Sequence, residues 1–182
     1  MQDNETQLLL HAKKTAQELA EKLKKHSLTL ALAESCTAGL ASSLLAEIPG
    51  ASQILWGCYV CYTKEAKISM LDLDNTALLA DGLVSGETAS SMAAMALQKS
   101  GADIAASVTG LAGPQGDGGG AAVGAVWTAA ARKGNIVTKG FHFTGGRNEI
   151  RLKAAAALFN EILKELRAIE AFSKLQFLKK LL

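Results

Sequence analysis

The amino-acid sequence predicts an α/β protein, a three-layer α/β/α sandwich built around a mixed, mostly parallel sheet. Short apolar segments of strand length alternate with longer segments whose apolar residues recur at helical spacing. Two neighbouring strands late in the chain are joined by a tight turn, which indicates one antiparallel hairpin. The composition agrees, because 49% of the 182 residues are hydrophobic but only 5% are aromatic. The core is therefore mostly Ala, Leu, Ile and Val, and a disordered chain is excluded.

The first half of the chain is expected to form three helices and two strands. Helical spacing of apolar residues indicates a helix over residues 5–26, and the apolar run over residues 28–33 is typical of a buried strand. A second helix is expected over residues 37–48, where Pro49 and Gly50 end it. Residues 53–62 are rich in β-branched and aromatic side chains and predict a strand. A short helix over residues 65–71 and a polar link at Asp74 and Asn75 follow.

The second half is expected to add a helix, three strands and a long final helix. Ser85 is a suitable N-cap for a helix that runs to about residue 99. Residues 103–108, 123–131 and 136–143 predict strands, and the last two are joined through Gly134. A helix from about residue 148 completes a single domain over residues 1–168, and residues 169–182 are expected to be a helical tail. Apolar residues of this tail can contact a partner: Ile169, Phe172, Leu175, Phe177 and Leu178.

The charge balance and the cysteines restrict what the protein can bind. Nineteen Lys and Arg against 17 Asp and Glu give a net charge of +2, which provides no broad surface for nucleic acid. No apolar stretch reaches the roughly 20 residues of a membrane span, and the polar start does not resemble a secretory signal. We therefore expect a cytoplasmic protein without a membrane partner. Three clustered cysteines predict neither a disulfide framework nor a zinc site, so no metal is expected. No cofactor is expected either.

Ser35 is the first candidate for chemistry, because it follows a buried strand at the start of a predicted helix. Free backbone N–H groups and the helix dipole at such a place favour an anion or an oxyanion. Open α/β sheets also bind ligands at the carboxyl ends of their strands. Two alternatives stay open. Ser35 or Thr37 can simply cap the helix, and Cys36 can be a rival nucleophile or a small buried hydrophobic residue.

A glycine-rich segment over residues 107–124 is the second candidate. It contains seven of the 17 glycines, which let a backbone approach a ligand closely and offer N–H groups to a phosphate. No Gly-Lys-Ser/Thr follows it, and a strand rather than a helix comes next, so it is neither a Walker A loop nor a dinucleotide fingerprint. The alternative is a flexible connection, against which Pro114, Leu111 and Ala112 argue.

A lysine is the expected base for a serine nucleophile in this chain. His11, His26 and His142 show no triad or ligand spacing and lie outside both candidate segments. A lysine can replace histidine where burial or a neighbouring cation lowers its pKa. Lys64 and Lys67 both follow the second predicted strand, and their spacing does not choose between them. For both, a solvated helix face is the alternative.

Five motifs occur in a distinctive order along the chain. They are Ala-Glu-Ser-Cys-Thr-Ala-Gly at 33–39, Tyr-Thr-Lys-Glu-Ala-Lys at 62–67, Val-Ser at 84–85, Ser-Val-Thr-Gly-Leu-Ala-Gly-Pro at 107–114 and Phe-Thr-Gly-Gly-Arg at 143–147. In this order the chain resembles the CinA C-terminal domain family over residues 7–165. Members of that family include the nicotinamide mononucleotide deamidases (the PncC type). The resemblance implies the stand-alone form of the domain, without the N-terminal domain of longer members.

The resemblance implies an amidohydrolase of pyridine nucleotide salvage. Such an enzyme converts nicotinamide mononucleotide into nicotinate mononucleotide and ammonia through an acyl-enzyme. Ser35 resembles the nucleophile and Lys67 its base, while Lys64 falls where the family varies. Tyr62 and Thr109 resemble the polar residues that support this pair.

Substrate contacts are expected from backbone amides, glycines and arginines. Helix-start N–H groups would stabilise the oxyanion, and the substrate phosphate would lie between the glycine segment and an arginine fork. Arg147 resembles the arginine that precedes the last helix of the family, and Arg151 follows one turn later. The expected substrate-binding residues are Cys36, Thr37, Gly110, Gly113, Arg147 and Arg151.

Three departures from the family pattern leave a second class of function open. Ala38 replaces the first Gly of the usual Cys-Thr-Gly-Gly, Cys61 stands where Thr or Ala is usual, and residues 115–122 lack a frequent Lys-Pro. The alternative is a nucleotide-binding or interaction module of the competence or DNA-damage response with little catalysis. The intact pair of Ser35 and Lys67 favours the enzyme. The family and the apolar tail also predict a homodimer or a higher homo-oligomer.

Overall fold

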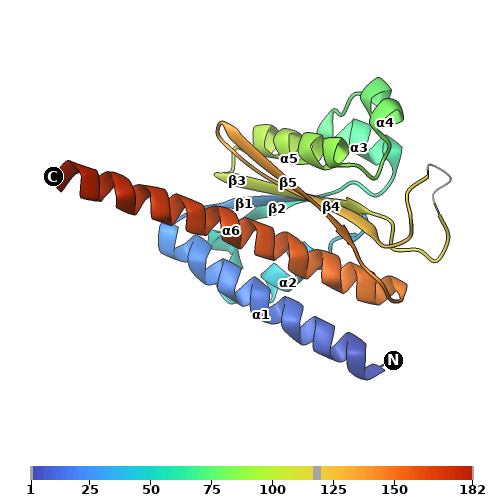
Figure 1. Cartoon of the computed structure of the whole chain (residues 1–182), viewed down its shortest axis with the longest axis horizontal. Helices are drawn as coiled ribbons and strands as arrows, with labels where there is room; N and C mark the ends of the chain where they lie inside the picture. The colour runs from blue at the N-terminus through green and yellow to red at the C-terminus, as the bar shows by residue number, and fades with distance from the viewer. Residues whose placement is uncertain (1, 117–119, 182) are drawn as a thin grey trace.

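A five-stranded sheet lies between two layers of helices in this computed structural model (Figure 1). The structure describes the backbone of residues 2–116 and 120–181 and, within these ranges, the side chains of all residues except 2, 3, 169 and 171–181. Helices α1, α2 and α6 cover one face of the sheet, and α3, α4 and α5 cover the other. The predicted α/β/α sandwich is therefore confirmed. In chain order the elements are α1 (Gln2–His26), β1 (Leu30–Glu34), α2 (Leu40–Ala46), the 3-10 turn η1 (Ala51–Gln53), β2 (Leu55–Val60), α3 (Lys64–Leu71), α4 (Asn75–Asp81), α5 (Gly86–Ser100), β3 (Ile104–Gly110), β4 (Ala125–Arg132), β5 (Asn135–His142) and α6 (Arg147–Leu181).

The sheet has the spatial order β2-β1-β3-β4-β5. Strand β1 is parallel to β2 and to β3, whereas β3 with β4 and β4 with β5 form antiparallel pairs. Four strands therefore point in one direction and β4 opposes them, as expected for a mixed sheet with one late hairpin. Because β1, β2 and β3 are neighbours and parallel, their carboxyl ends meet at one end of the sheet.

Alternate residues of β1, an inner strand, pack against the helices on the two faces of the sheet. Leu30 and Leu32 of β1 pack with α1, α2 and α6, whereas Ala31 and Ala33 face the opposite layer. The small side chains on that second face allow α5 to lie close to the sheet. The predicted cap of α5 is also confirmed, because Ser85 Oγ accepts a hydrogen bond of 3.0 Å from a backbone N–H of the first turn.

Helix α2 is shorter than the sequence predicts. A helix was expected over residues 37–48, but α2 begins at Leu40 and ends at Ala46. Ala38 and Gly39 adopt positive φ angles of 51° and 89°, which a right-handed helix cannot contain. Residues 35–39 therefore form a turn, and the expectation that Ser35 lies at a helix start is wrong.

Helix α4 occupies the segment that was expected to be a polar link. The carboxylate of Asp74 accepts a hydrogen bond of 2.8 Å from the backbone N–H of Ala77 and so caps the first turn. Aspartate is a strong N-cap residue, and the sequence alone does not distinguish this role from that of a polar link. The link at Asp74 and Asn75 is therefore corrected to a helix start.

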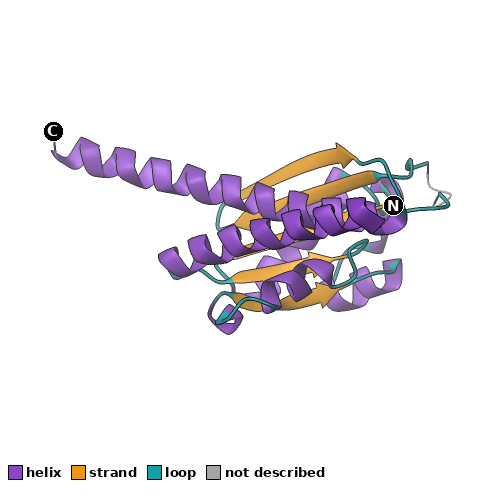
Figure 2. Ribbon diagram, turned by 90° about the horizontal axis from the view of Figure 1, so that it is seen from below, coloured by secondary structure: helices purple, strands orange, loops and turns teal. Residues whose placement is uncertain are grey.

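Helix α6 continues without interruption past residue 168, where the tail was expected to begin. Figure 2 shows its C-terminal part extending beyond the sheet and the other helices. The apolar residues proposed as a partner contact (Ile169, Phe172, Leu175, Phe177 and Leu178) lie outside the described side chains. Among the described helices, none has both the length and the apolar character that crossing a membrane requires.

Candidate active site

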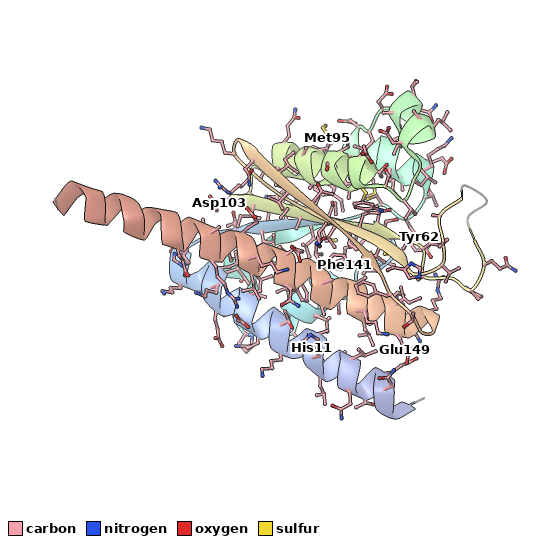
Figure 3. The ribbon with its side chains drawn as sticks, viewed as in Figure 1. His11, Tyr62, Met95, Asp103, Phe141 and Glu149 are labelled. Carbon is pink, nitrogen blue, oxygen red and sulfur yellow. The ribbon has the colours of Figure 1, made fainter. Side chains whose placement is uncertain are left out.

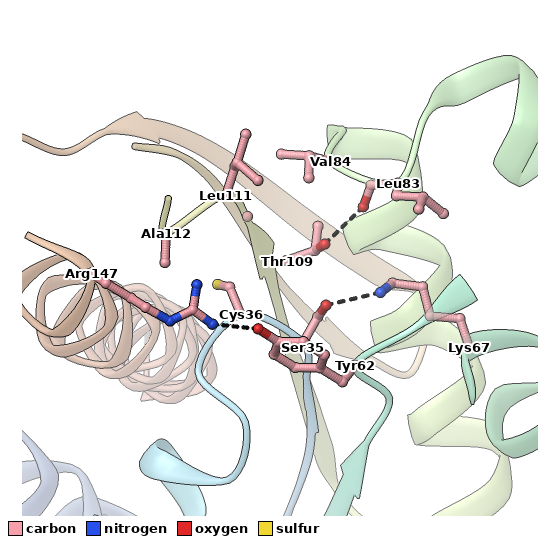
Figure 4. Close-up of a pocket in the computed structure, with 11 residues that line it drawn as sticks. Ser35, Cys36, Tyr62, Lys67, Leu83, Val84, Thr109, Leu111, Ala112 and Arg147 are labelled. Atoms are coloured by element: carbon pink, nitrogen blue, oxygen red, sulfur yellow. Dashed lines mark hydrogen bonds between the residues drawn. The ribbon is translucent and has the colours of Figure 1, made fainter. Parts of the chain in front are cut away.

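A pocket of about 170 Å³ opens at the carboxyl ends of β1 and β3. In Figure 3 this is the end of the sheet marked by Tyr62, and Asp103, which precedes β3, marks the opposite end. Ligands of open α/β sheets bind at the carboxyl ends of the strands. Figure 4 shows the lining residues, which are Ser35, Cys36, Tyr62, Lys67, Leu83, Val84, Thr109, Gly110, Leu111, Ala112 and Arg147.

Ser35 and Lys67 meet at the base of this pocket. Lys67 Nζ donates a hydrogen bond of 2.9 Å to Ser35 Oγ and a second of 3.1 Å to the carbonyl of Cys61. The serine is fixed from the other side, since its backbone N–H donates to the carbonyl of Val108 at 2.9 Å. The structure thus brings together the two residues that the motifs paired, while Lys64 does not line the pocket.

Burial shifts Lys67 toward its neutral form. The side chain is only 2% exposed, on the second turn of α3, whose N-cap is Thr63. Burial lowers the pKa of this amine, and nearby Cys61 and Cys36 oppose the shift. Among the described residues, no carboxylate forms an ion pair with Lys67. The arrangement favours a neutral amine, which is the form that can accept a proton.

The turn over residues 35–39 provides backbone N–H groups beside the serine. Within the described part of the chain, no other residue accepts a hydrogen bond from the N–H of Cys36 or Thr37, whereas that of Ala38 donates to Ser35. Free amides next to a nucleophile can stabilise an oxyanion. These donors belong to the turn. The prediction that they lie at the start of a helix is therefore wrong. Of these two residues, Cys36 lines the pocket, whereas Thr37 is buried and does not.

The two arginines have different positions. Arg147 lies at the pocket mouth, where it donates to Tyr62 Oη at 2.5 Å and to the carbonyl of Gly113 at 2.6 Å. Arg151 does not line the pocket. Its guanidinium donates to the carbonyl of Thr37 at 2.8 Å and so holds the turn. Gly113 likewise lies outside the lining and acts through its bond to Arg147.

Thr109, Tyr62 and Gly110 line the pocket without a hydrogen bond to the Ser35–Lys67 pair. The hydroxyl of Thr109 donates to the carbonyl of Leu83 at 2.8 Å and so holds one wall in place (Figure 4). Gly110 packs directly on β4, because a Cβ there would lie 2.7 Å from a side-chain atom of Val126. Thr109 and Gly110 therefore shape the pocket. Residues 117–119 of the glycine-rich segment lie outside the described residues.

Glu34 is a residue of this site that the sequence analysis missed. It ends β1 and is completely buried, and its carboxylate accepts hydrogen bonds from the backbone N–H groups of Ala41 at 3.1 Å and Ser42 at 2.7 Å. A charged residue at the end of an otherwise apolar strand is the signal that could have found it, since buried charges are rare. In the part of the chain that the structure describes, no group of His, Cys, Asp and Glu side chains could hold a metal ion.

Fold and pocket together define an α/β protein with a buried serine–lysine pair beside free backbone amides, which is a combination suited to nucleophilic chemistry. The model of the CinA C-terminal domain matches residues 12–166 of the chain. The chain therefore belongs to the CinA C-terminal domain family.

Curated relatives and solved structures agree with this family. A CinA-like protein of Geobacter metallireducens is 38% identical over 148 residues, which is 81% of this chain and 36% of that protein. A putative competence-damage inducible protein of Lacticaseibacillus casei is 38% identical over 157 residues, which is 86% of this chain and 37% of that protein. The chain thus spans little more than a third of the length of these relatives.

Two crystal structures illustrate the likeness of the fold. The competence/damage inducible protein CihA from Agrobacterium tumefaciens superposes with a TM-score of 0.81 at 36% identity, over 86% of this chain and 96% of that one. The competence damage-inducible protein A from Klebsiella pneumoniae superposes with a TM-score of 0.83 at 29% identity, over 86% of this chain and 97% of that one.

Proposed function

We propose that the protein is an amidohydrolase that converts nicotinamide mononucleotide into nicotinate mononucleotide and ammonia. One observation carries this proposal: a buried lysine amine lies 2.9 Å from a serine hydroxyl in a pocket, and no described carboxylate pairs with it. A neutral amine at this distance can take the proton of the hydroxyl as the oxygen attacks a carbonyl carbon.

The reaction proceeds through an acyl-enzyme. Ser35 Oγ attacks the carboxamide carbon while Lys67 Nζ accepts its proton, and the amides of Cys36 and Thr37 stabilise the oxyanion. Such donors contribute about 3–4 kcal/mol each in other enzymes. Protonated Lys67 then donates to the leaving nitrogen, and ammonia departs as the C–N bond breaks. Water, deprotonated by Lys67, attacks the ester and releases the carboxylate product.

The pocket walls suit an aromatic amide. Leu83, Val84, Leu111 and Ala112 are apolar lining residues that can contact a flat ring and leave its carboxamide toward Ser35. At the mouth, Arg147 would exchange its bonds to Tyr62 and to the glycine-rich segment for the substrate phosphate, which its fork fits well.

Incubation of the purified chain with nicotinamide mononucleotide tests the proposal. We expect ammonia and nicotinate mononucleotide in equal amounts, measured by a coupled ammonia assay and by mass spectrometry. The relatives named as competence-damage inducible favour a second candidate, a nucleotide-binding or interaction module. Saturable binding of the mononucleotide in calorimetry without release of ammonia would support that module and contradict the amidohydrolase.

A further inference from the structure

Glu34 is a buried charge that backbone donors hold in place. Its side chain is fully buried, and among the described residues no cation forms an ion pair with it. Its carboxylate is satisfied by two N–H groups of α2, from Ala41 and Ser42, and Cys58 Sγ donates to it at 3.5 Å. A buried carboxylate needs such partners, because burial of an isolated charge is very unfavourable.

These bonds tie together the two ends of the turn that carries Ser35. Glu34 precedes the turn over residues 35–39, and Ala41 and Ser42 follow it. The turn contains Ala38 in a left-handed conformation, which persists only where the surroundings enforce it. Its middle is held by Arg151 through the carbonyl of Thr37. The hydrogen bonds of the Glu34 carboxylate to Ala41 and Ser42 therefore span the whole turn.

We propose that Glu34 is a positioning residue that fixes the turn carrying Ser35 and selects Ser35 over Cys36 as the nucleophile of the pocket. The inference deepens the proposed function and rests on it, since both require Ser35 as the nucleophile. Glu34 does not line the pocket, so it acts through the turn and through its charge.

Cys36 is the second possible nucleophile of the pocket, and the negative charge of Glu34 disfavours its reactive thiolate form. Both Cys36 and Lys67 line the pocket, and transfer of the thiol proton to the amine would produce a thiolate and an ammonium. The thiolate would be the stronger nucleophile, and the ammonium could no longer accept the Ser35 proton. A negative charge at Glu34 opposes formation of the thiolate.

The groups facing Cys36 from each neighbouring element agree with this role. Burial raises the pKa of the Cys36 thiol to about 12, and Glu34 of β1 adds to the rise. Lys67 of α3 and Arg151 of α6 oppose it. Burial and Glu34 also raise the pKa of Cys58 and Cys61. The Cys58 thiol donates to the Glu34 carboxylate, and the Cys61 thiol donates to the backbone carbonyl of Glu34 at 3.7 Å.

Two variants separate the effect of the Glu34 charge from the effect of its side-chain length. Glu34→Gln removes the charge and turns an amide N–H against one of the two backbone donors. Glu34→Asp keeps the charge but shortens the side chain by one methylene. Glu47→Gln is the matched control, because Glu47 is exposed at the other end of α2 and, among the described residues, forms an ion pair with Lys13 alone.

Two labelling reactions read out the variants, with folding checked by circular dichroism. A fluorophosphonate probe forms a bond from Ser35 Oγ to phosphorus and releases fluoride, and iodoacetamide alkylates Cys36 across a pH series, both followed by peptide mass spectrometry. We expect Glu34→Gln to slow Ser35 labelling by about tenfold to 100-fold, because small displacements of a nucleophile cost that much, and to speed Cys36 alkylation with a lower pH midpoint.

The other two variants complete the test. Glu34→Asp should slow Ser35 labelling while Cys36 stays as unreactive as in the unsubstituted chain, and Glu47→Gln should change neither. A folded Glu34→Gln that labels Ser35 at the normal rate would overturn the proposal. If that variant does not fold, Glu34→Asp decides: normal Ser35 labelling, or free alkylation of Cys36, would overturn it.

The labelling is independent of the substrate. An unsubstituted chain that labels on Ser35 but releases no ammonia from nicotinamide mononucleotide would contradict the proposed function. The comparison of the Glu34 variants would still decide the role of Glu34.

Discussion

Lys67 is the residue on which the proposed chemistry depends, because an amine acts as a base only when it is neutral. Burial lowers its pKa, and the cysteines beside it oppose the shift. Turnover should therefore rise with pH as Lys67 loses its proton, with a midpoint below the usual lysine value of about 10.4. The pH dependence of kcat/KM for nicotinamide mononucleotide measures this midpoint.

Lys64 is the natural control for that measurement, since it lies one turn earlier on the same helix and outside the pocket lining. Lys64→Ala should keep both the rate and its pH dependence, while Lys67→Ala should lose most activity at every pH. The opposite outcome for the two lysines would show that Lys64, and not Lys67, is the base.

Ala38 is the turn residue whose backbone is least suited to its side chain. Its φ of 51° costs an alanine roughly 1–2 kcal/mol, and glycine would lose about 0.5–1 kcal/mol through its greater freedom when unfolded. Ala38→Gly should therefore raise the free energy of unfolding in urea by about 0.5 kcal/mol. Ala80→Gly, at an exposed position within α4, should lower it by about 1 kcal/mol. Equal losses in both variants would show that Ala38 is not strained.

Sequence reasoning reached the residues of the site unequally. The order of the predicted strands indicated that a lysine of residues 62–67 lies close to Ser35, because the carboxyl ends of neighbouring parallel strands converge. The spacing did not choose between Lys64 and Lys67, and only the resemblance to the family paired Ser35 with Lys67. The sequence alone predicted neither the role of Glu34 nor the hydrogen bond from Thr109 to the carbonyl of Leu83. Which carbonyl or amide a polar side chain meets depends on turns and on helices far away in the chain, and periodicity carries no information about those.

The end of β3 lines the pocket and packs tightly against β4. A Cβ on Gly110 would lie 2.7 Å from a Val126 methyl and 2.8 Å from the carbonyl oxygen of Ala125, so β3 and β4 would have to separate. Gly110→Ala should lower the free energy of unfolding by about 1–3 kcal/mol, as overpacking does elsewhere. Gly116→Ala, which has open space around it, should stay within about 0.5 kcal/mol of the parent in urea unfolding. A Gly110→Ala variant as stable as Gly116→Ala would contradict the close packing.

At the scale of elements, strands and long helices were predictable and short helices were not. The five strands follow from apolar runs and β-branched residues, which report burial directly. The start of α2 was misplaced, because Ala38 gives no sign that its backbone is left-handed. Helix α4 was missed because seven residues are too few for a clear helical period, and only its Asp74 cap indicates it.

In the molecule as a whole, hydrogen bonds of Glu170 join α6 to the C-terminal part of α1. Glu170 accepts hydrogen bonds from Lys22 at 2.8 and 2.9 Å and lies 2.7 Å from Nε2 of His26. These bonds hold the pKa of Glu170 at about 2, below its ordinary 4.5. The folded state thus binds fewer protons than the unfolded state between these two values. The stabilisation is complete above pH 4.5 and disappears as the pH falls toward 2.

Glu170→Gln tests this link between the two helices. The urea midpoint of the variant should lie below that of the parent near neutral pH, and the difference should close as the pH falls through the window from 4.5 to 2. Glu21→Gln is an exposed control on α1, whose carboxylate accepts a hydrogen bond from Gln17 on the same helix, and it should show no such closure. A difference that stays constant with pH would mean that the carboxylate does not link the helices.

The family match and the helix do not end together. The match stops at residue 166, whereas α6 continues to Leu181, and the two solved structures cover 86% of the chain. We propose that residues 1–168 contain the whole chemical site and that the chain forms a homo-oligomer. All the pocket residues lie before residue 148, so the extension of α6 is free for another role.

The proposed function depends on Ser35 as the nucleophile of an amidohydrolase. The most direct measurement is the rate of ammonia release from nicotinamide mononucleotide by Ser35→Ala against the unsubstituted chain, with both shown to have the same urea midpoint. We expect a fall of about 1,000-fold or more, as loss of a nucleophile produces in other hydrolases. A folded Ser35→Ala that releases ammonia at the full rate would contradict it.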